Sequence, residues 1–249
     1  MVNMTLLETR GLVKKYSGRA VVNEISITID QRSIVGLLGR NGAGKTTTFR
    51  MIMGMITPNS GSVIFEGRDI AKLPMYKRAR LGIGYLSQEP SIFRRLSVRD
   101  NLYAILETMS ITRAERNRKA DMLIDHFALN EVADSQGRFL SGGERRKLEI
   151  ARAMVTDPSL ILLDEPFSGV DPIAVEDLQQ EIRQLVAGGV SILITDHNVD
   201  RTLEVVDKAY IIDHGKVIGA GSPAEVVRNE TVRRHYLGNI FAGNEFDDR

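Results

Sequence analysis

The sequence predicts an α/β protein with a mainly parallel sheet and flanking helices, and three observations support this class. Residues 33–38 (SIVGLL) form an apolar run that ends at a glycine-rich loop and precedes an apolar helical segment. The runs LILL and VSILI read as two more buried strands, with a helical pattern between them. At 249 residues without cysteine, the chain is long enough to bury such a core without disulfides or metals.

The first part of the chain predicts short antiparallel strands. Ile25, Ile27 and Ile29 alternate with polar residues, as a half-buried strand requires. The run SVIFEG follows the turn-like segment TPNSG, which indicates a second strand. We therefore expect an N-terminal antiparallel β subdomain beside the parallel core.

The middle of the chain predicts a helical subdomain. Residues 113–129 are densely charged, and Leu123 and Phe127 share one helical face. The later helical pattern keeps its apolar residues on one stripe, formed by Val175, Leu178, Ile182 and Leu185. We expect a single domain over 1–249, divided into a nucleotide-binding core at about 1–88 and 157–249 and a helical subdomain at about 89–156.

Charge and apolar runs limit the cellular role. The net charge of +1 argues neither for nor against nucleic acid, although residues 72–119 hold eleven Lys and Arg against four Asp and Glu. No secretory signal is visible, and no apolar run approaches the ~18 residues of a spanning helix. We therefore expect a cytoplasmic location, any membrane role being peripheral. The tail GNIFAGNEFDDR is expected to fray or to dock on a partner.

The segment GRNGAGKT, residues 39–46, has the spacing of a phosphate-binding loop and lies between a predicted strand and helix. Its glycines let backbone N–H groups turn toward phosphate oxygens, Lys45 adds a positive charge, and Thr46 offers a hydroxyl to Mg²⁺. A nucleoside triphosphate is the expected ligand. The predicted nucleotide contacts here are Gly39, Arg40, Asn41, Gly42, Ala43, Gly44, Lys45, Thr46 and Thr47.

Two adjacent carboxylates, Asp164 and Glu165, end the apolar run in LILLDEP. The carboxyl edge of a parallel sheet is where ligands bind in open α/β folds, so both are expected to face the nucleotide. One can hold a Mg²⁺ ion while the other orients a water for in-line attack on the γ-phosphorus. The residues alone leave open which carboxylate does which.

A second anion site is predicted at SGGE, residues 141–144. Ser141 and Glu144 have the spacing of a capping box, which explains these two residues. It does not explain Gly142 and Gly143, since each glycine costs about 1 kcal/mol relative to alanine in a helix. Without side chains, this helix start can approach an anion closely. Local chemistry does not say whose anion it is.

Six motifs, in order along nearly the whole chain, resemble those of the ATP-binding-cassette ATPases, which are the motor subunits of transporters. They are KKY, GYLSQEP, LSGGE, LLDEP, SGVD and ITDHNVD. The resemblance implies an ATPase that uses ATP and Mg²⁺ and forms a head-to-tail homodimer. In the loop, Arg40 replaces the proline of many relatives; binding should survive, because backbone groups form the cradle.

The resemblance also assigns residue roles. It implies that Tyr16 stacks on adenine and that Gln88 links the Mg²⁺ and the attacking water to the membrane-facing lobe. It makes Asp164 the magnesium ligand, Glu165 the general base and His197 the γ-phosphate sensor. It places Ser141, Gly142 and Gly143 against the γ-phosphate held by the other subunit, and Asp171 in the loop that crosses the dimer interface.

Two longer runs, residues 82–102 and 194–223, resemble the ATPases of lipopolysaccharide export systems, which implies a place on the cytoplasmic face of the inner membrane beside two integral permease subunits. The alternatives are the ATPases of branched-chain amino-acid importers and, in another class, soluble cassette proteins that act in DNA repair or translation. A single cassette without a long coiled-coil insertion disfavours the soluble class. A P-loop kinase or GTPase would not explain LSGGE and ITDH together.

Phe93, flanked by Arg94 and Arg95 just after Gln88, suggests the membrane contact. An apolar knob with a basic rim suits a groove that receives a short helix from a membrane subunit. Phe93 could equally be an ordinary core residue of the helical subdomain. No contact with nucleic acid is expected.

Overall fold

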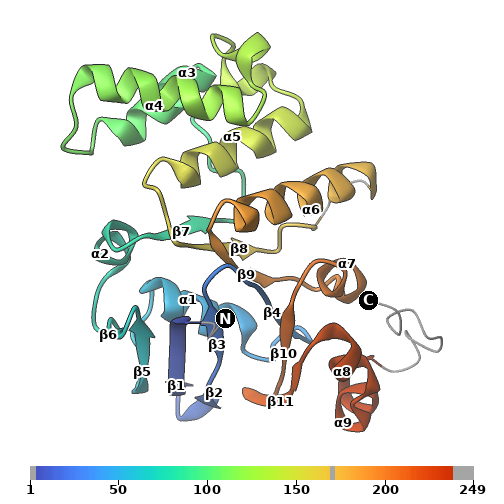
Figure 1. Cartoon of the computed structure of the whole chain (residues 1–249). Coiled ribbons are helices and arrows are strands. Elements are labelled where there is room, and N and C mark those ends of the chain that lie inside the picture. The colour runs from blue at the N-terminus through green and yellow to red at the C-terminus, as the bar shows by residue number, and fades with distance from the viewer. Residues whose placement is uncertain (1–3, 169–171, 238–249) are drawn as a thin grey trace.

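The computed structural model describes residues 4–168 and 172–237 and consists of an α/β body with a helical lobe above it (Figure 1). Within these residues, no helix is long and apolar enough to cross a membrane. The predicted interface residue Asp171 and the tail from residue 238 lie outside the described residues.

A six-stranded sheet forms the centre of the body. All neighbouring strands run parallel except for the antiparallel edge pair β10–β11. In spatial order the strands are β11 (Lys216–Gly221), β10 (Lys208–Asp213), β4 (Ile34–Gly39), β9 (Ser191–Thr195), β8 (Leu160–Asp164) and β7 (Ile83–Leu86). The three apolar runs predicted to be buried strands are thus the adjacent central strands β4, β9 and β8, which confirms the α/β class. Their carboxyl ends meet at one edge, where the predicted site residues follow.

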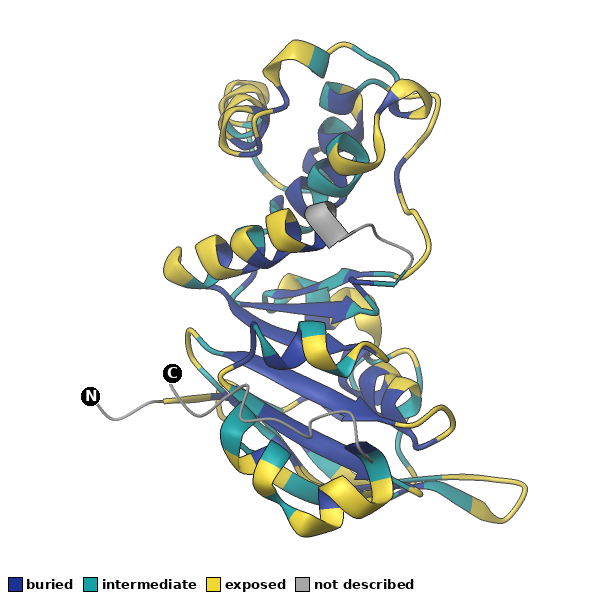
Figure 2. Ribbon diagram, turned by 90° about the vertical axis from the view of Figure 1, so that its right-hand side faces the viewer, coloured by how far each residue is buried: buried dark blue, intermediate teal, exposed yellow. Residues whose placement is uncertain are grey.

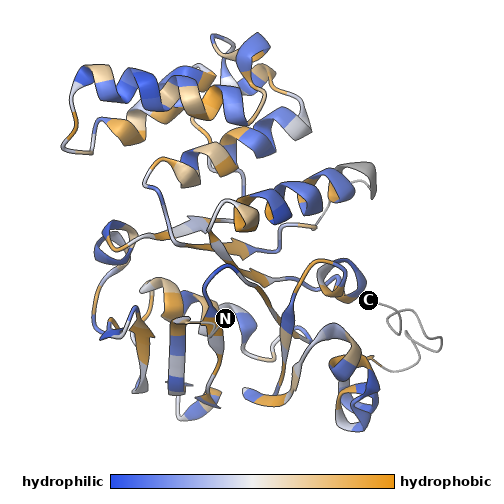
Figure 3. Cartoon of the chain, in the orientation of Figure 1, coloured by the Kyte–Doolittle hydropathy of each residue, from blue (hydrophilic) through white to orange (hydrophobic). Residues whose placement is uncertain are grey.

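Both faces of this sheet are buried, which is why its strands are apolar throughout rather than alternating. Along β4, Ile34 and Leu38 enter the core shared with the helical lobe and the helices around β9 and β10, whereas Val35 and Leu37 enter the core beneath the antiparallel sheet. Figure 2 shows the strands as the buried centre of the body, and Figure 3 shows hydrophobic residues along several of them.

The predicted N-terminal antiparallel sheet is present. Its strands are β1 (Thr5–Tyr16), β2 (Arg19–Ile25), β3 (Thr28–Asp30), β5 (Ser60–Phe65) and β6 (Arg68–Asp69). The isoleucine alternation does not form one strand: β2 ends at Ile25, and β3 begins after Ile27. The buried Thr9 hydroxyl bridges this break, because it donates to the carbonyl of Ile25 at 3.3 Å and accepts from the N–H of Ile27 at 2.9 Å.

The helical lobe lies in the chain between β7 and β8. Its elements are α3 (Val98–Leu106), α4 (Arg113–His126), the short 3₁₀ turns Asn130–Val132 and Gly137–Phe139, and α5 (Gly142–Met154). The predicted charged helix is confirmed as α4, which a Thr112–Glu115 capping box starts. It ends before residue 129, since Ala128 adopts a left-handed conformation with φ 49°. The subdomain boundaries at about 89 and 156 stay a prediction.

The remaining helices flank the sheets. They are α1 (Lys45–Met53), α2 (Met75–Arg80), α6 (Pro172–Ala187), α7 (Val199–Leu203), α8 (Pro223–Arg228), α9 (Glu230–Val232) and the π-type turn η3 (Arg233–Leu237). The predicted stripe of α6 is buried at all four positions. The fully buried Arg78 guanidinium holds the end of α1, because its Nη1 donates to the carbonyls of Met51 and Ile52 at 2.8 and 2.6 Å.

Candidate active site

The phosphate loop joins β4 to α1, and its backbone needs glycine at two tightly packed points. Gly39 has φ 152°, and a Cβ there would lie 2.1 Å from the carbonyl oxygen of Ile212. Gly44, the N-cap of α1, has φ 109°, and a Cβ there would lie 2.7 Å from the carbonyl of Val21. An L side chain at either place would meet both strain and backbone. These two glycines therefore shape the loop around its neighbours in the same chain.

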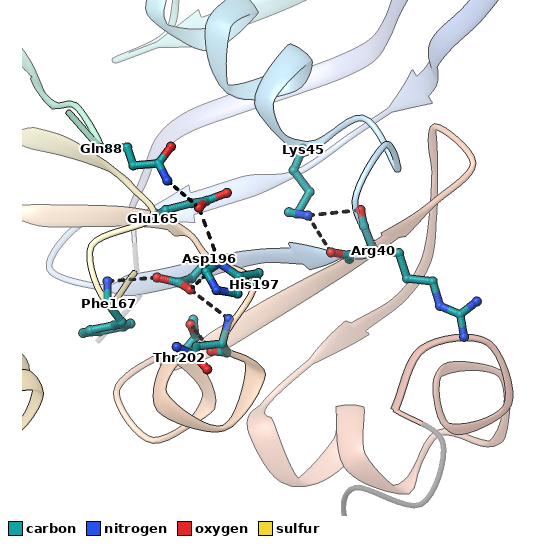
Figure 4. Close-up of polar contacts among 10 residues, drawn as sticks. Arg40, Lys45, Gln88, Glu165, Phe167, Asp196, His197 and Thr202 are labelled. Atoms are coloured by element: carbon teal, nitrogen blue, oxygen red, sulfur yellow. Dashed lines mark hydrogen bonds and ion pairs between the residues drawn. The ribbon is translucent and has the colours of Figure 1, made fainter. Parts of the chain in front are cut away.

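Lys45 is the first residue of α1, and its side chain folds back against the phosphate loop. Its Nζ donates to the carbonyls of Gly39 at 2.5 Å and Arg40 at 3.1 Å (Figure 4). Burial lowers the pKa of the Lys45 ammonium, while the carboxylates of Glu165, Asp196 and Asp164 oppose that shift. An ammonium on the flexible lysine side chain can transfer its hydrogen bonds from these carbonyls to phosphate oxygens.

The other predicted loop residues differ in exposure. Arg40 directs its guanidinium away from Lys45 (Figure 4). Asn41, Gly42 and Thr46 are exposed, Ala43 is buried, and Thr47 is half-buried. The exposed Thr46 hydroxyl stands in the first turn of α1, where a phosphate-bound cation can reach it.

Asp164 ends β8 and lies beside Tyr85 of β7. The Tyr85 hydroxyl donates to Oδ2 of Asp164 at 3.4 Å, a contact that the sequence analysis did not foresee. Burial raises the pKa of the Asp164 carboxyl, and the neighbouring Glu165 carboxylate raises it further. Burial likewise raises the pKa of the Tyr85 phenol, so that it remains a hydrogen-bond donor.

Glu165 is the point where the predicted catalytic residues converge. Its Oε2 accepts from Nε2 of Gln88 at 3.0 Å and lies 3.4 Å from Nδ1 of His197 (Figure 4). Its backbone is left-handed, with φ 47°, and its N–H donates to the carbonyl of Thr195 at 2.6 Å. A non-glycine residue held in this region is strained by about 1–3 kcal/mol, and such strain clusters at functional sites.

Asp196 stabilises the two segments that carry Glu165 and His197. Its side chain is fully buried; Oδ2 accepts from the N–H of Phe167 at 3.0 Å, and Oδ1 accepts from the N–H of Asn198 at 2.8 Å. Burial raises the pKa of its carboxyl, and the two backbone donors and His197 oppose that shift. Asp196 thus fastens the loops that carry Glu165 and His197. The sequence analysis gave it no role, although an acid at the end of a buried strand was a signal.

The predicted capping box at the start of α5 is present. The Ser141 hydroxyl accepts from the N–H of Glu144 at 3.3 Å, and the Glu144 carboxylate accepts from the N–H of Ser141 at 2.8 Å. The Ser141 hydrogen bonds lower the pKa of the Glu144 carboxyl. A Cβ at Gly142 or Gly143 would meet no atom within 4 Å. Nothing in the described chain therefore requires glycine at these two positions.

A hollow of about 360 Å³ lies between helix α5 and the predicted catalytic residues Gln88 and Glu165. Its lining includes Gly142 and Gly143 of α5 together with these two predicted catalytic residues. The rest of its lining comes from the segment after β7, from α5, from α6 and from the chain around Pro166, namely Pro90, Arg145, Arg146, Lys147, Glu149, Ile150, Pro166, Ser168, Asp177, Leu178 and Glu181. Within one chain, the start of α5 and two of the predicted catalytic residues thus line the same hollow.

Two predicted contact residues lie away from this cluster. Tyr16 ends β1 with an exposed ring that has Nζ of Lys14 at 5.5 Å from its centroid. Phe93 is 48% exposed, which makes the alternative of a core residue wrong. The Arg152 guanidinium lies over its ring at 4.7 Å, and Arg94 and Arg95 are exposed beside it.

The oxygen donors near the loop suit Mg²⁺, which usually takes one or two protein ligands together with substrate phosphates. Asp164 offers a carboxylate, Thr46 a hydroxyl and Gln88 an amide oxygen, all of them hard ligands. Among the residues that the structure describes, no group of three or more His, Cys, Asp or Glu could hold a metal by itself. The chemistry of the donor set fits a cation that arrives with a nucleotide.

Comparisons with known proteins agree with this geometry. Residues 22–168 match the family model of ABC transporters, and residues 216–242 match that of branched-chain amino acid ATP-binding cassette transporters. The lipopolysaccharide export system ATP-binding protein LptB of Haemophilus influenzae is 51% identical over 239 residues, covering 96% of this chain and 99% of that protein. The LptB of Acidithiobacillus ferridurans is 50% identical over 236 residues, covering 95% and 98%.

Solved structures show the same fold. The ADP conformation of MJ1267, an ATP-binding cassette of an ABC transporter, matches with a TM-score of 0.85 and 26% identity over 94% of this chain and 99% of that one. The cbiO1 subunit of Clostridium perfringens, part of the ABC transporter complex cbiONQ, matches with a TM-score of 0.85 and 26% identity over 96% of both chains.

Proposed function

This chain belongs to the ABC transporter family, and we propose that it is the ATP-hydrolysing motor subunit that powers lipopolysaccharide export. Family membership makes it an ATP-binding ATPase coupled to transport. The cargo is inferred from the relatives: those named for lipopolysaccharide export are 50–51% identical over nearly the whole of both chains. We place the subunit at the cytoplasmic face of the inner membrane, held there by its permease partners.

The observation that carries the catalytic proposal is the convergence on Oε2 of Glu165. Gln88 follows β7, Glu165 follows β8 and His197 follows β9, yet both nitrogens reach this one oxygen, at 3.0 and 3.4 Å. Three side chains from separate strands meet at one carboxylate because parallel strands end at a common edge. Such a constellation suits a positioned base with two orienting groups.

In the proposed reaction, the ATP phosphates occupy the loop from Gly39 to Thr46. Lys45 exchanges its loop carbonyls for the β- and γ-phosphate oxygens, and Asp164, Thr46 and Gln88 would hold the magnesium ion, whose charge neutralises the phosphates. Glu165 accepts the proton of the attacking water, whose oxygen forms the new bond to the γ-phosphorus while the bond to the β–γ bridging oxygen breaks. Gln88 orients that water, and His197 steadies both the carboxylate and the γ-phosphate.

Two copies complete the site. In a head-to-tail homodimer, Ser141, Gly142 and Gly143 of one copy would face the γ-phosphate on the loop of the other, Asp171 would lie in the crossing loop, and Tyr16 would stack on adenine. The open space around both glycines supports this arrangement, because the chain itself leaves that approach free. Ser141→Arg should therefore spare nucleotide binding by the monomer and prevent the ATP-driven dimer and its hydrolysis.

The membrane subunits are proposed to contact Phe93, Arg94 and Arg95. An exposed phenylalanine with a basic rim fits a short helix that carries an apolar residue and an acidic one. Phe93→Ala should abolish co-purification with the membrane pair while soluble ATPase activity stays near normal. Met122→Ala, at a 56% exposed apolar side chain on α4, is the matched control and should co-purify normally. Intact association of the Phe93 variant would refute this contact.

A second candidate, the ATPase of a branched-chain amino-acid importer, is favoured by one observation, the match over residues 216–242. Purification of the tagged chain from its native membranes, with identification of the stoichiometric integral partners, discriminates the two. The purified complex should release lipopolysaccharide from proteoliposomes in an ATP-dependent manner, and the Glu165→Gln complex should not. Uptake of branched-chain amino acids instead would contradict lipopolysaccharide export while leaving the ATPase assignment intact.

A further inference from the structure

Asn101 is a fully buried polar side chain at the start of α3, in the helical lobe (Figure 1). Its Oδ1 accepts from the N–H of Phe93 at 2.8 Å, while Nδ2 donates to the carbonyls of Phe93 at 3.0 Å and Ser97 at 2.8 Å. These partners use the oxygen and both N–H groups of the side-chain amide. One buried residue therefore holds both backbone groups of Phe93, whose ring is the proposed contact with the membrane subunits.

Residues 93–97 form a turn around this amide. The N–H of Leu96 donates to the carbonyl of Phe93 at 3.1 Å, and both arginines of the turn are exposed. Backbone N–H and C=O groups that face the protein interior need a partner there, so the shape of this turn depends on Asn101.

The segment that leads to the SGGE helix start holds the same turn from the other side. The N–H of Gly137 donates to the carbonyl of Leu96 at 2.9 Å, and the N–H of Arg138 donates to the carbonyl of Arg94 at 2.9 Å. Gly137 is buried, and a Cβ there would lie 3.2 Å from the carbonyl oxygen of Phe93. Two segments that are distant in the sequence therefore form one hydrogen-bonded unit, and the buried amide lies within it.

We propose that Asn101 is a positioning residue for the membrane subunits, because it holds the 93–97 turn in the shape that presents Phe93, Arg94 and Arg95 together. The proposal rests on the membrane contact proposed for these three residues. A partner that binds an ordered turn loses less conformational entropy than one that must order the turn on binding. Without Asn101 the three contacting side chains remain, but the membrane subunits would have to order their backbone.

Asn101→Leu tests this, because leucine is similar in size, suits a helix and makes none of the hydrogen bonds. The binding partner is the membrane pair from native membranes, freed of the ATPase subunit and kept in detergent. The dissociation constant for this pair should rise roughly tenfold or more, whereas the affinity for ADP should be unchanged. In the free variant, amide hydrogen exchange at Phe93 and Gly137 should become at least about tenfold faster, while exchange in α4 stays the same.

Thr9→Val is the matched control, since it also removes two buried hydrogen bonds, but in the antiparallel sheet. It should lower the melting temperature and leave the affinity for the membrane pair unchanged. Gly137→Ala is a second variant that keeps Asn101. Its Cβ presses on the 93–97 turn from the other side, so the dissociation constant should rise roughly two- to fivefold even if Asn101→Leu does not fold.

An unchanged dissociation constant of the Asn101 variant would overturn the proposal, and so would unchanged hydrogen exchange at Phe93. An equal loss of affinity in Thr9→Val would overturn it as well, because that result indicates general destabilisation. Phe93→Ala separates this test from the proposed contact. If Phe93→Ala binds the membrane pair weakly and Asn101→Leu binds it normally, only the role of Asn101 is wrong. If Phe93→Ala binds normally, the proposed contact itself is wrong, and Asn101 has no contact to position.

Discussion

Two glycine-rich helix starts in this chain look alike in sequence and differ in structure. The phosphate loop before α1 and the SGGE segment at α5 are both predicted to present backbone N–H groups to an anion. In the first, Gly39 and Gly44 have positive φ and would collide with backbone oxygens at 2.1 and 2.7 Å if they carried a Cβ. In the second, Gly142 and Gly143 are helical, and a Cβ at either meets nothing within 4 Å.

The difference separates two reasons for glycine. At the phosphate loop the chain's own fold forbids a side chain, so the site is shaped within one molecule. At α5 the fold leaves room for a side chain, and the proposed approach of a second copy would give a reason for glycine there. This difference is what we expect if, as proposed, the active site forms between the phosphate loop of one copy and the α5 helix start of another.

The largest expected effect comes from Gly39→Ala. The backbone collision and the strained φ should destabilise the nucleotide-free protein by about 3–5 kcal/mol and abolish nucleotide binding. Urea unfolding and ADP titration measure the two effects. Gly42→Ala is a useful companion, since a Cβ there meets nothing and only φ 79° is unfavourable. Equal stability of the Gly39 variant and the wild type would show that the loop does not need this glycine.

Glu165→Gln should be the next largest change. It removes the proton acceptor while an amide can still contact Gln88 and His197, so hydrolysis should fall about 100-fold or more with ATP binding retained. In ATP and Mg²⁺ the variant should accumulate as a closed dimer, measured by size-exclusion chromatography with light scattering. Turnover at the normal rate would remove Glu165 from its catalytic role.

Gly143→Ala tests the second helix start directly. Because alanine is the better helix former, the nucleotide-free monomer should be as stable as the wild type or up to about 1 kcal/mol more stable. Its ADP affinity should be unchanged, whereas the ATP-dependent dimer of the Glu165→Gln background should be lost. Should that dimer form normally, the glycines are not needed for the approach of a second copy.

Asp164→Asn should produce the smallest effect on the nucleotide-free protein, a rise of a few degrees in melting temperature near neutral pH. The folded-state pKa of Asp164 is raised, so its protonated form stabilises the fold below the normal carboxyl pKa of about 4, and that contribution is lost as pH rises through the raised value. The advantage of the asparagine variant should therefore shrink on acidification. Thermal unfolding from pH 4 to 8 measures this, and a constant difference would contradict it.

The sequence by itself determined the features that depend on neighbouring residues. Short apolar runs predicted β4, β8 and β9, the glycine spacing predicted the phosphate loop, and the S-x-x-E spacing predicted the capping box at α5. Each follows from contacts within a few positions, where backbone geometry and side-chain chemistry suffice.

Only the tertiary structure decided how distant segments meet. The Thr9 hydroxyl spans the break between β2 and β3 through hydrogen bonds to residues 16 and 18 positions away. The Tyr85 hydroxyl contacts Asp164 across 79 positions. The left-handed backbone of Glu165, whose N–H donates to the carbonyl of Thr195, likewise depends on strand order and packing. No local pattern specifies such contacts, because they arise only when strands distant in the sequence pair or end at a common sheet edge.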